Sequence, residues 1–133
     1  ARLMRLLETQ AAIVAELNAS AELLAAVSGV YDHVPQGVVF PYVIVGEAYT
    51  TPLDNATHTG SDMSIDLHVW SRYRGRKEAR EIQALIYNVL NRSELDGLAG
   101  LVTCEQQWSR DFLDEDGLTR HGVQRYTVEV QHT

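Results

Sequence analysis

The sequence is poor in cysteine, and this scarcity excludes several kinds of protein. Cys104 is the only cysteine among 133 residues. An internal disulfide needs two cysteines and a multi-cysteine metal site needs more, so this chain can form neither. A single thiol fits a reducing compartment. We therefore do not expect a small secreted domain held together by disulfide bonds.

Long apolar runs and an excess of positive charge are also missing. No apolar run approaches the roughly 20 residues that a membrane-spanning helix requires. Arg2 and Arg5 stand inside an amphipathic pattern, unlike the apolar centre of a secretion signal. The chain has 11 Lys and Arg against 18 Asp and Glu, a formal charge of −7. We expect neither a membrane protein nor a general nucleic-acid binder, since such binding needs cations against phosphates.

Motifs for catalysis or for binding cofactors and metals are absent as well. The sequence has no glycine-rich phosphate loop and no Gly-x-Ser-x-Gly turn around a nucleophile. Its histidines are scattered, and no two have the spacing of a zinc motif. We therefore predict no catalytic, cofactor-binding or metal-binding residues. The histidines are His33, His58, His68, His121 and His132.

A small hydrolytic enzyme is kept as an alternative because three residues have suitable chemistry. Asp66 and His68 alternate on one predicted strand and could form an acid–base pair. Cys104 could act as a nucleophile beside a histidine. The simpler interpretation places Asp66 and His68 on a solvent-facing strand face, and Cys104 among small core residues.

The stretch that organises the chain covers residues 63–90. In residues 63–70, apolar and polar side chains alternate, which predicts a strand with one buried face. Residues 71–75 break this alternation and form a basic turn. From residue 76 to residue 90 the apolar period becomes about 3.6, which predicts an amphipathic helix. We expect this helix to pack on a sheet that contains the preceding strand.

The remaining segments complete an α+β domain over residues 1–133. The predicted order is α-α-β-β-β-α-β-β, with a mostly antiparallel sheet of about four to five strands and helices packed on one face. On the strand at 101–108, parity places Val102, Cys104 and Trp108 on one side. The predicted helices cover 1–18, 21–28 and 76–90, and the extended segments cover 30–33, 42–49, 63–70, 101–108 and 122–131.

The polar segment at residues 50–61 joins two strong predicted strands. It has no hydrophobic period, and its twelve residues exceed the two to five of most hairpin loops. It is either an ordinary surface loop or an arm that projects to meet a partner. If it is an arm, Leu53, Asp54 and His58 are the candidate contact residues.

Large side chains on otherwise polar strand faces give further candidates for an assembly interface. Trp70 has the parity of Asp66 and His68, opposite the core set, although it could also pack locally under the following turn. Trp108 is a second candidate. Tyr73 and Arg74 lie in the basic turn, which favours an acidic partner subunit over nucleic acid because Glu78 and Glu81 follow closely.

Several stretches together resemble a known family. They are YDHVPQG at 31–37, FPYVIVGE at 40–47, LHVWSRYRG at 67–75, DGLTRHGV at 116–123, and the pair Arg125 and Tyr126. In the same order along nearly the whole chain, they resemble the tail-completion family of long-tailed bacteriophages. This family is also called the tail-terminator or head–tail joining family, and it has relatives in prophages and gene transfer agents.

The resemblance implies an α+β subunit that assembles into a ring, typically of six copies. Such a ring caps the head-proximal end of the tail tube, stops its growth and offers a surface to the head or neck proteins. Genomic DNA passes through the centre without specific binding. The implied location is the virion tail, after assembly in the bacterial cytoplasm, and no enzymatic activity or cofactor is implied. Another neck or tail-tube component of the same particle is the alternative.

Overall fold

The computed structural model describes residues 2–54 and 59–132. Its elements follow the predicted order α-α-β-β-β-α-β-β. In chain order they are α1 (Arg2–Asn18), α2 (Ala21–Ala26), β1 (Val30–Tyr31), β2 (Tyr42–Pro52), β3 (Thr59–Ser71), α3 (Lys77–Leu90), β4 (Leu101–Leu113) and β5 (Arg120–His132).

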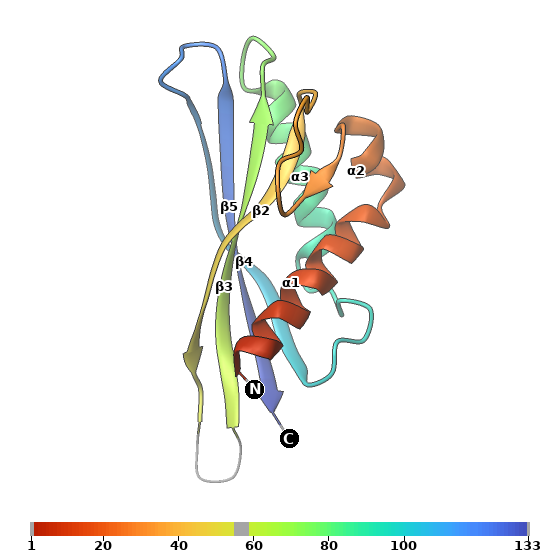
Figure 1. Cartoon of the computed structure of the whole chain (residues 1–133), viewed down its shortest axis with the longest axis vertical. Helices are drawn as coiled ribbons and strands as arrows, with labels where there is room; N and C mark the ends of the chain where they lie inside the picture. Colours follow the sequence, from red (N-terminus) through yellow and green to blue (C-terminus); the bar gives the residue numbers. More distant parts are fainter. Residues whose placement is uncertain (1, 55–58, 133) are drawn as a thin grey trace.

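The strands form one five-stranded sheet in the order β1-β2-β3-β5-β4. The short β1 runs parallel to β2, and every other neighbouring pair is antiparallel. Figure 1 shows α1, α2 and α3 on the same face of this sheet. The predicted α+β class and the placement of helices on one face are therefore confirmed.

The core lies between this face and the helices. On β3, Met63, Ile65, Leu67 and Val69 are all fully buried, as their alternation predicted. Across from them on β5, Tyr126 pairs with Ile65 in the sheet register. Because side chains alternate along a strand, the other half of β3 must face away from the helices.

The helices cover the core with apolar stripes at helical spacing. On α3, the buried residues include Ala79, Ile82, Ile86 and Leu90. On α1, Ile13 and Leu17 are fully buried. The α1 helix contacts β1, β2 and β3, whereas α3 contacts β3, β4 and β5, so each helix covers one half of the sheet.

The prediction of an irregular segment at 50–61 is wrong at both of its ends, which make up half of its length. The β2 strand continues to Pro52 and β3 begins at Thr59, with Thr50 paired to Met63 and Pro52 to Ser61. Backbone pairing does not require apolar side chains, so a polar hairpin end escapes a hydrophobicity pattern. Strand pairing therefore extends from β2 and β3 into both ends of the predicted segment.

The predicted shared side of Val102, Cys104 and Trp108 is also wrong. The β4–β5 register shifts between Leu101 and Thr103 and again between Gln106 and Trp108. Each β-bulge adds a residue and reverses the parity of the strand beyond it. Cys104 therefore faces the helices and is 1% exposed, whereas Val102 is 46% exposed.

The turn between β4 and β5 is held by one carboxylate. Asp116 Oδ1 accepts hydrogen bonds from the backbone N–H groups of Leu118 and Thr119, and its Oδ2 accepts one from the Thr119 hydroxyl. These bonds favour the charged form and lower the pKa of Asp116 to about 2. Gly117 takes the left-handed conformation, with φ of +70°.

Candidate functional site

The sheet face opposite the helices is the most distinctive surface of the described chain. We call it the open face, because none of the described helices packs on it (Figure 1). Cross-strand register brings large aromatic, basic and histidine side chains together there. The open-face residues considered below are Tyr49, Asp66, His68, Trp70, Trp108, Arg110, Phe112, His121 and Arg125.

His121 lies at the centre of an aromatic cluster in the half of the open face near the β4–β5 turn. Its ring stacks on Trp70, with ring centroids 3.8 Å apart and planes inclined by 15°. Phe112 packs against the same ring, with centroids 4.8 Å apart. Trp70 and Phe112 belong to the two strands on either side of His121, so the cluster ties β3, β5 and β4 together. The cluster thus makes a rigid, partly apolar surface.

His121 also forms a hydrogen-bonded pair with His68. The distance between His121 Nε2 and His68 Nδ1 is 2.8 Å, and His68 Nε2 lies 3.2 Å from Glu47 Oε2. One imidazole must donate and the other accept, so the pair is satisfied when both rings are neutral. Burial, together with the nearby His68, lowers the pKa of His121 to about 4. At neutral pH the His121 ring is therefore uncharged.

A second group on the open face is built around an ion pair. Arg125 donates from Nε and Nη2 to both carboxylate oxygens of Asp66, at 2.7 and 3.1 Å. The Arg125 guanidinium carbon lies 5.5 Å from the centre of the Tyr49 ring and 5.1 Å from that of Trp108. Asp66 is 8% exposed, so water reaches little of its carboxylate. The Arg125 guanidinium balances its negative charge. This arrangement fixes the two aromatic rings around a cation.

The residues of the enzyme hypothesis do not converge. Asp66 and His68 lie on the open face, whereas Cys104 points into the core on the opposite face. Burial raises the pKa of the Cys104 thiol to about 12, which leaves almost no thiolate at neutral pH. Asp66 is engaged by Arg125 rather than by His68. Within residues 2–54 and 59–132, no cluster of three or more His, Cys, Asp or Glu is arranged to hold a metal ion.

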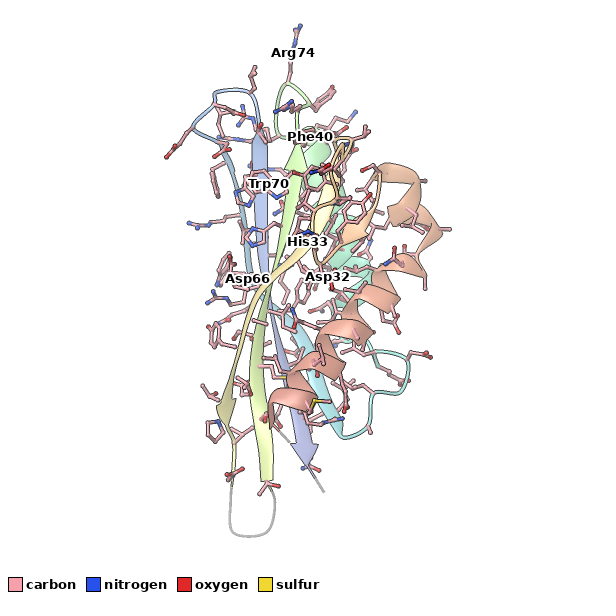
Figure 2. All side chains as sticks on the ribbon, viewed as in Figure 1. Asp32, His33, Phe40, Asp66, Trp70 and Arg74 are labelled. Atoms are coloured by element: carbon pink, nitrogen blue, oxygen red, sulfur yellow. The ribbon has the colours of Figure 1, made fainter. Side chains whose placement is uncertain are left out.

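The predicted assembly residues fall in three separate places instead of one site. Trp70 and Trp108 lie on the open face. Tyr73 and Arg74 occupy the turn after β3 at one end of the molecule, where Figure 2 shows Arg74 pointing away from the body. Leu53 and Asp54 follow β2 at the other end (Figure 1). His58 falls outside the described residues.

Sequence reasoning missed the open-face cluster because its members come from three strands. His121 and Phe112 both fall outside the strands predicted at 122–131 and 101–108. Alternation along the strand predicted at 122–131 puts Tyr126 and Val128 inward and Arg125 outward, and the structure confirms this position of Arg125. Only the register between strands reveals that these side chains meet Trp70 and Trp108, and that register includes a bulge.

Most of the chain matches a known protein family. Residues 11–131 match the family described as tail completion protein gp17. The chain belongs to this tail completion family. The family resemblance found in the sequence is therefore confirmed, and membership makes the chain a structural tail completion protein of a phage-type particle.

Two known proteins match this chain over nearly its whole length, one in sequence and one in fold. The tail completion protein gp17 of Bacillus phage SPP1 is 28% identical over 123 residues, covering 90% of each chain. A chain from the virion of a native gene transfer agent particle has a similar fold, with a TM-score of 0.81 and 24% identity. That alignment covers 92% of this chain and 94% of the other.

Among the described helices, none is long and apolar enough to cross a bilayer.

Proposed function

We propose that this tail completion protein forms a ring of copies, six by analogy with the family, on the head-proximal end of a phage-type tail tube. The ring ends tube polymerisation and presents its other side to the head or neck proteins. DNA passes through its centre, and the net charge of −7 opposes adhesion of DNA to the wall. Family membership over residues 11–131 is the observation that carries the proposal.

The open face supports a role in assembly. It holds a rigid aromatic cluster, and Phe112 (37% exposed) and Tyr49 (49% exposed) present much of their rings to solvent. Aromatic and arginine side chains are enriched at the centres of protein interfaces. Trp108 and Arg125 are already fixed by cation–π contacts, so little side-chain freedom would be lost on binding. An interface that is ordered before contact suits a subunit that must assemble into a particle.

The two ends of the molecule support two different axial contacts. At one end the turn after β3 exposes Tyr73 beside Arg74. At the other end the β2–β3 hairpin extends beyond the helices (Figure 1), and Leu53 is 45% exposed beside Asp54. We assign the hairpin end to the tail tube and the Arg74 end to the neck. A cap that joins two unlike structures needs two unlike ends.

Purified protein mixed with tail tubes tests this function. We expect electron micrographs to show one cap per tube, at one end, and native mass spectrometry to give a fixed number of copies per cap. Tubes that stay bare at saturating protein would contradict the proposal. A monomer in the absence of tubes would not, since the ring can form on the tube itself.

Deletion of the gene separates a terminator from another neck or tube component. Loss of the terminator should leave tubes of abnormal length that do not join heads. Loss of a tube subunit should remove tubes altogether, and loss of a neck protein should leave tubes of normal length. Complementation with the wild-type gene provides the control.

A further inference from the structure

A groove of about 410 Å³ runs along one flank of the molecule between α1 and the edge of the sheet. Its floor is apolar and comes from α1, β1 and β2. Leu7 and Ala11 are exposed on its helical wall, and Met4 extends the same exposed stripe by one turn. The lining residues are Leu7, Gln10, Ala11, Val14, Ala15, Val30, Tyr31, Asp32 and Val45. We call this region the α1 groove.

The α1 groove carries negative charge and no positive charge. Asp32 is its only charged lining residue, and Figure 2 shows Asp32 between β2 and α1. No Lys or Arg occurs in the sequence between Arg5 and Arg72. Arg5 itself is turned to another side of α1, where it pairs with Glu8 at 2.5 Å and donates to the Ala99 carbonyl. The natural occupant of this groove is therefore an apolar surface that carries a cation.

The opposite flank of the same molecule has such a surface on α3. Arg80, Ala84 and Tyr87 stand at helical spacing and are all exposed, Tyr87 by 42%. They form a ridge in which a small alanine separates a cation from an aromatic ring. Sheet order puts the two flanks far apart, because α1 covers the β1–β2 edge and α3 covers the β4 edge. One copy therefore cannot place its own ridge in its own groove.

The charge on the α3 ridge complements that of the groove. Asp111 lies 3.1 Å from Arg80 Nε and 3.5 Å from Arg76 Nε, so two guanidinium groups share one carboxylate. Arg110, the residue before Asp111, adds no charge here, because its guanidinium lies over Trp108 and Phe112 on the open face. Lys77 is matched by Glu81 at 3.9 Å. Two guanidinium groups on one carboxylate leave a surplus of one positive charge beside the ridge to face Asp32.

We propose that the α3 ridge of one copy packs into the α1 groove of the next copy. This proposal rests on the proposed function, because it names the surfaces that join neighbours in the ring. Ala84 of the ridge meets Ala11 on the wall of the groove, where two small side chains let the helices approach closely. Tyr87 enters the apolar floor, and Arg80 faces Asp32.

Such a contact is head-to-tail, since it joins two different patches. A repeated head-to-tail contact closes into a ring when its rotation allows, whereas a self-complementary contact stops at a dimer. Each subunit would then contact its neighbours in the ring through its two flanks. The open face and both ends would remain for other surfaces of the particle. Ridge-in-groove packing is also the usual way in which an exposed helix docks on a partner.

Cysteine cross-linking on tail tubes tests the contact, using a flexible bismaleimide. The native Cys104 is buried and stays unreactive. The double variant Ala11→Cys with Ala84→Cys should give a ladder of covalent oligomers up to the full ring on a denaturing gel. Each single variant should give no covalent dimer. A mixture of the two single variants should give dimers and nothing larger, because each copy then has one reactive flank.

A matched control pairs Ala11→Cys with Ala99→Cys, which is exposed but lies on neither flank, and it should give no ladder. A charge swap provides a second measurement that does not depend on cross-linking. Asp32→Arg alone and Arg80→Asp alone should each weaken capping at least tenfold, and the two changes combined should restore most of it. Circular dichroism checks that each variant is folded.

The outcomes separate this inference from the proposed function. If wild-type protein caps tubes but the double variant caps them without a ladder, and the charge swap shows no rescue, the flanks are wrong and the function stands. Covalent dimers from Ala84→Cys alone would mean a self-complementary contact and would also overturn the inference. A ladder in concentrated protein that never caps tubes would support the contact and contradict the function.

Discussion

At the scale of the residue, the open face is defined by pairs whose partners come from different strands. Asp66 and His68 sit two residues apart, yet Asp66 bonds to Arg125 and His68 bonds to His121. Each pair buries polar atoms that would be costly if left without a partner. The identity of a single residue says little here, because its role depends on which side chain stands opposite.

The histidine pair makes a prediction about pH. The pKa of His121 is about 4 in the folded protein and 6.5 as an ordinary value, so the unfolded chain binds a proton more readily. The stabilisation is complete above about pH 6.5 and is lost as the pH falls towards 4. We expect the free energy of unfolding to drop by about 1–2 kcal/mol across this range, after allowing for the partly exposed ring.

Urea denaturation at a series of pH values measures this effect. The variant His121→Phe keeps an aromatic ring beside Trp70 and should flatten the dependence between pH 6.5 and 4. His33 is exposed, so His33→Gln should leave the dependence unchanged. Equal slopes in wild type and His121→Phe would show that His121 is not the titrating group.

At the scale of the element, the connection between α3 and β4 does more than join them. Arg92 N–H donates to the Cys104 carbonyl at 2.6 Å, and the Asn91 side chain accepts from Gln106 N–H at 2.9 Å. These bonds satisfy backbone groups at the start of β4, an edge strand. Exposed strand edges invite unwanted pairing, and covering them is a common protection. Arg92 takes a left-handed conformation, with φ of 62°, in this segment.

Removing the Asn91 side chain tests this edge protection. The variant Asn91→Ala leaves Gln106 N–H without its acceptor, and we expect a loss of about 1 kcal/mol in the free energy of unfolding. Hydrogen exchange at Gln106 should accelerate more than at other β4 amides. Asn88→Ala removes an exposed amide from the last turn of α3, just before this connection, and serves as the control. Unchanged exchange at Gln106 would contradict the assigned bond.

Two glycines of the same connection give a matched comparison. Gly97 and Gly100 both have positive φ, +74° and +76°, which a side chain disfavours. A Cβ on Gly97 would meet nothing within 4 Å, whereas on Gly100 it would stand 2.2 Å from the Gln131 carbonyl oxygen. We expect Gly97→Ala to cost about 1 kcal/mol and Gly100→Ala about 3 kcal/mol or more.

Chemical denaturation of both glycine variants measures the difference. The backbone of β5 cannot retreat without disturbing the hydrogen bond from Gln131 N–H to the Gly100 carbonyl, at 2.7 Å. The strain from φ is common to both variants, so the difference between them isolates the steric clash. Equal destabilisation would mean that the two chain segments separate easily at this point.

At the scale of the whole molecule, the subunit presents surfaces of different residue composition on its different sides. The open face, the α1 groove, the α3 ridge and the two ends each have their own composition. In the proposed ring, each of these surfaces would have its own neighbour. Family membership as a tail completion protein agrees with such a design.

The hairpin end gives a prediction at this scale. Leu53 N–H donates to the Gly60 carbonyl at 3.0 Å, so these two residues already face each other across the hairpin. Replacing residues 54–59 with Asn-Gly should close a tight turn and leave the melting temperature within a few degrees, because loop tips add little to a core. We expect binding to tail tubes to fall at least tenfold, measured by counting capped ends. Unchanged capping would make the hairpin end a passive surface.

The sequence by itself predicted the class of fold, the order of the elements and the family. Alternation on β3 and the helical period of α3 arise from burial of one face, and burial leaves a direct trace in the residue pattern. The same parity correctly placed Trp70 and Arg125 away from the helices. The expectation of an irregular segment at 50–61 was wrong at 50–52 and 59–61, because polar strands leave no such trace.

Only the tertiary structure decided which of these residues meet. Trp108 joined Arg125 on the open face because a bulge between Gln106 and Trp108 reversed the parity of β4, and a bulge has no reliable signal in the local pattern. The α1 groove and the α3 ridge likewise depend on which helix covers which half of the sheet. Local patterns record whether a side chain is buried, whereas its neighbours are set by strand register and packing between distant segments.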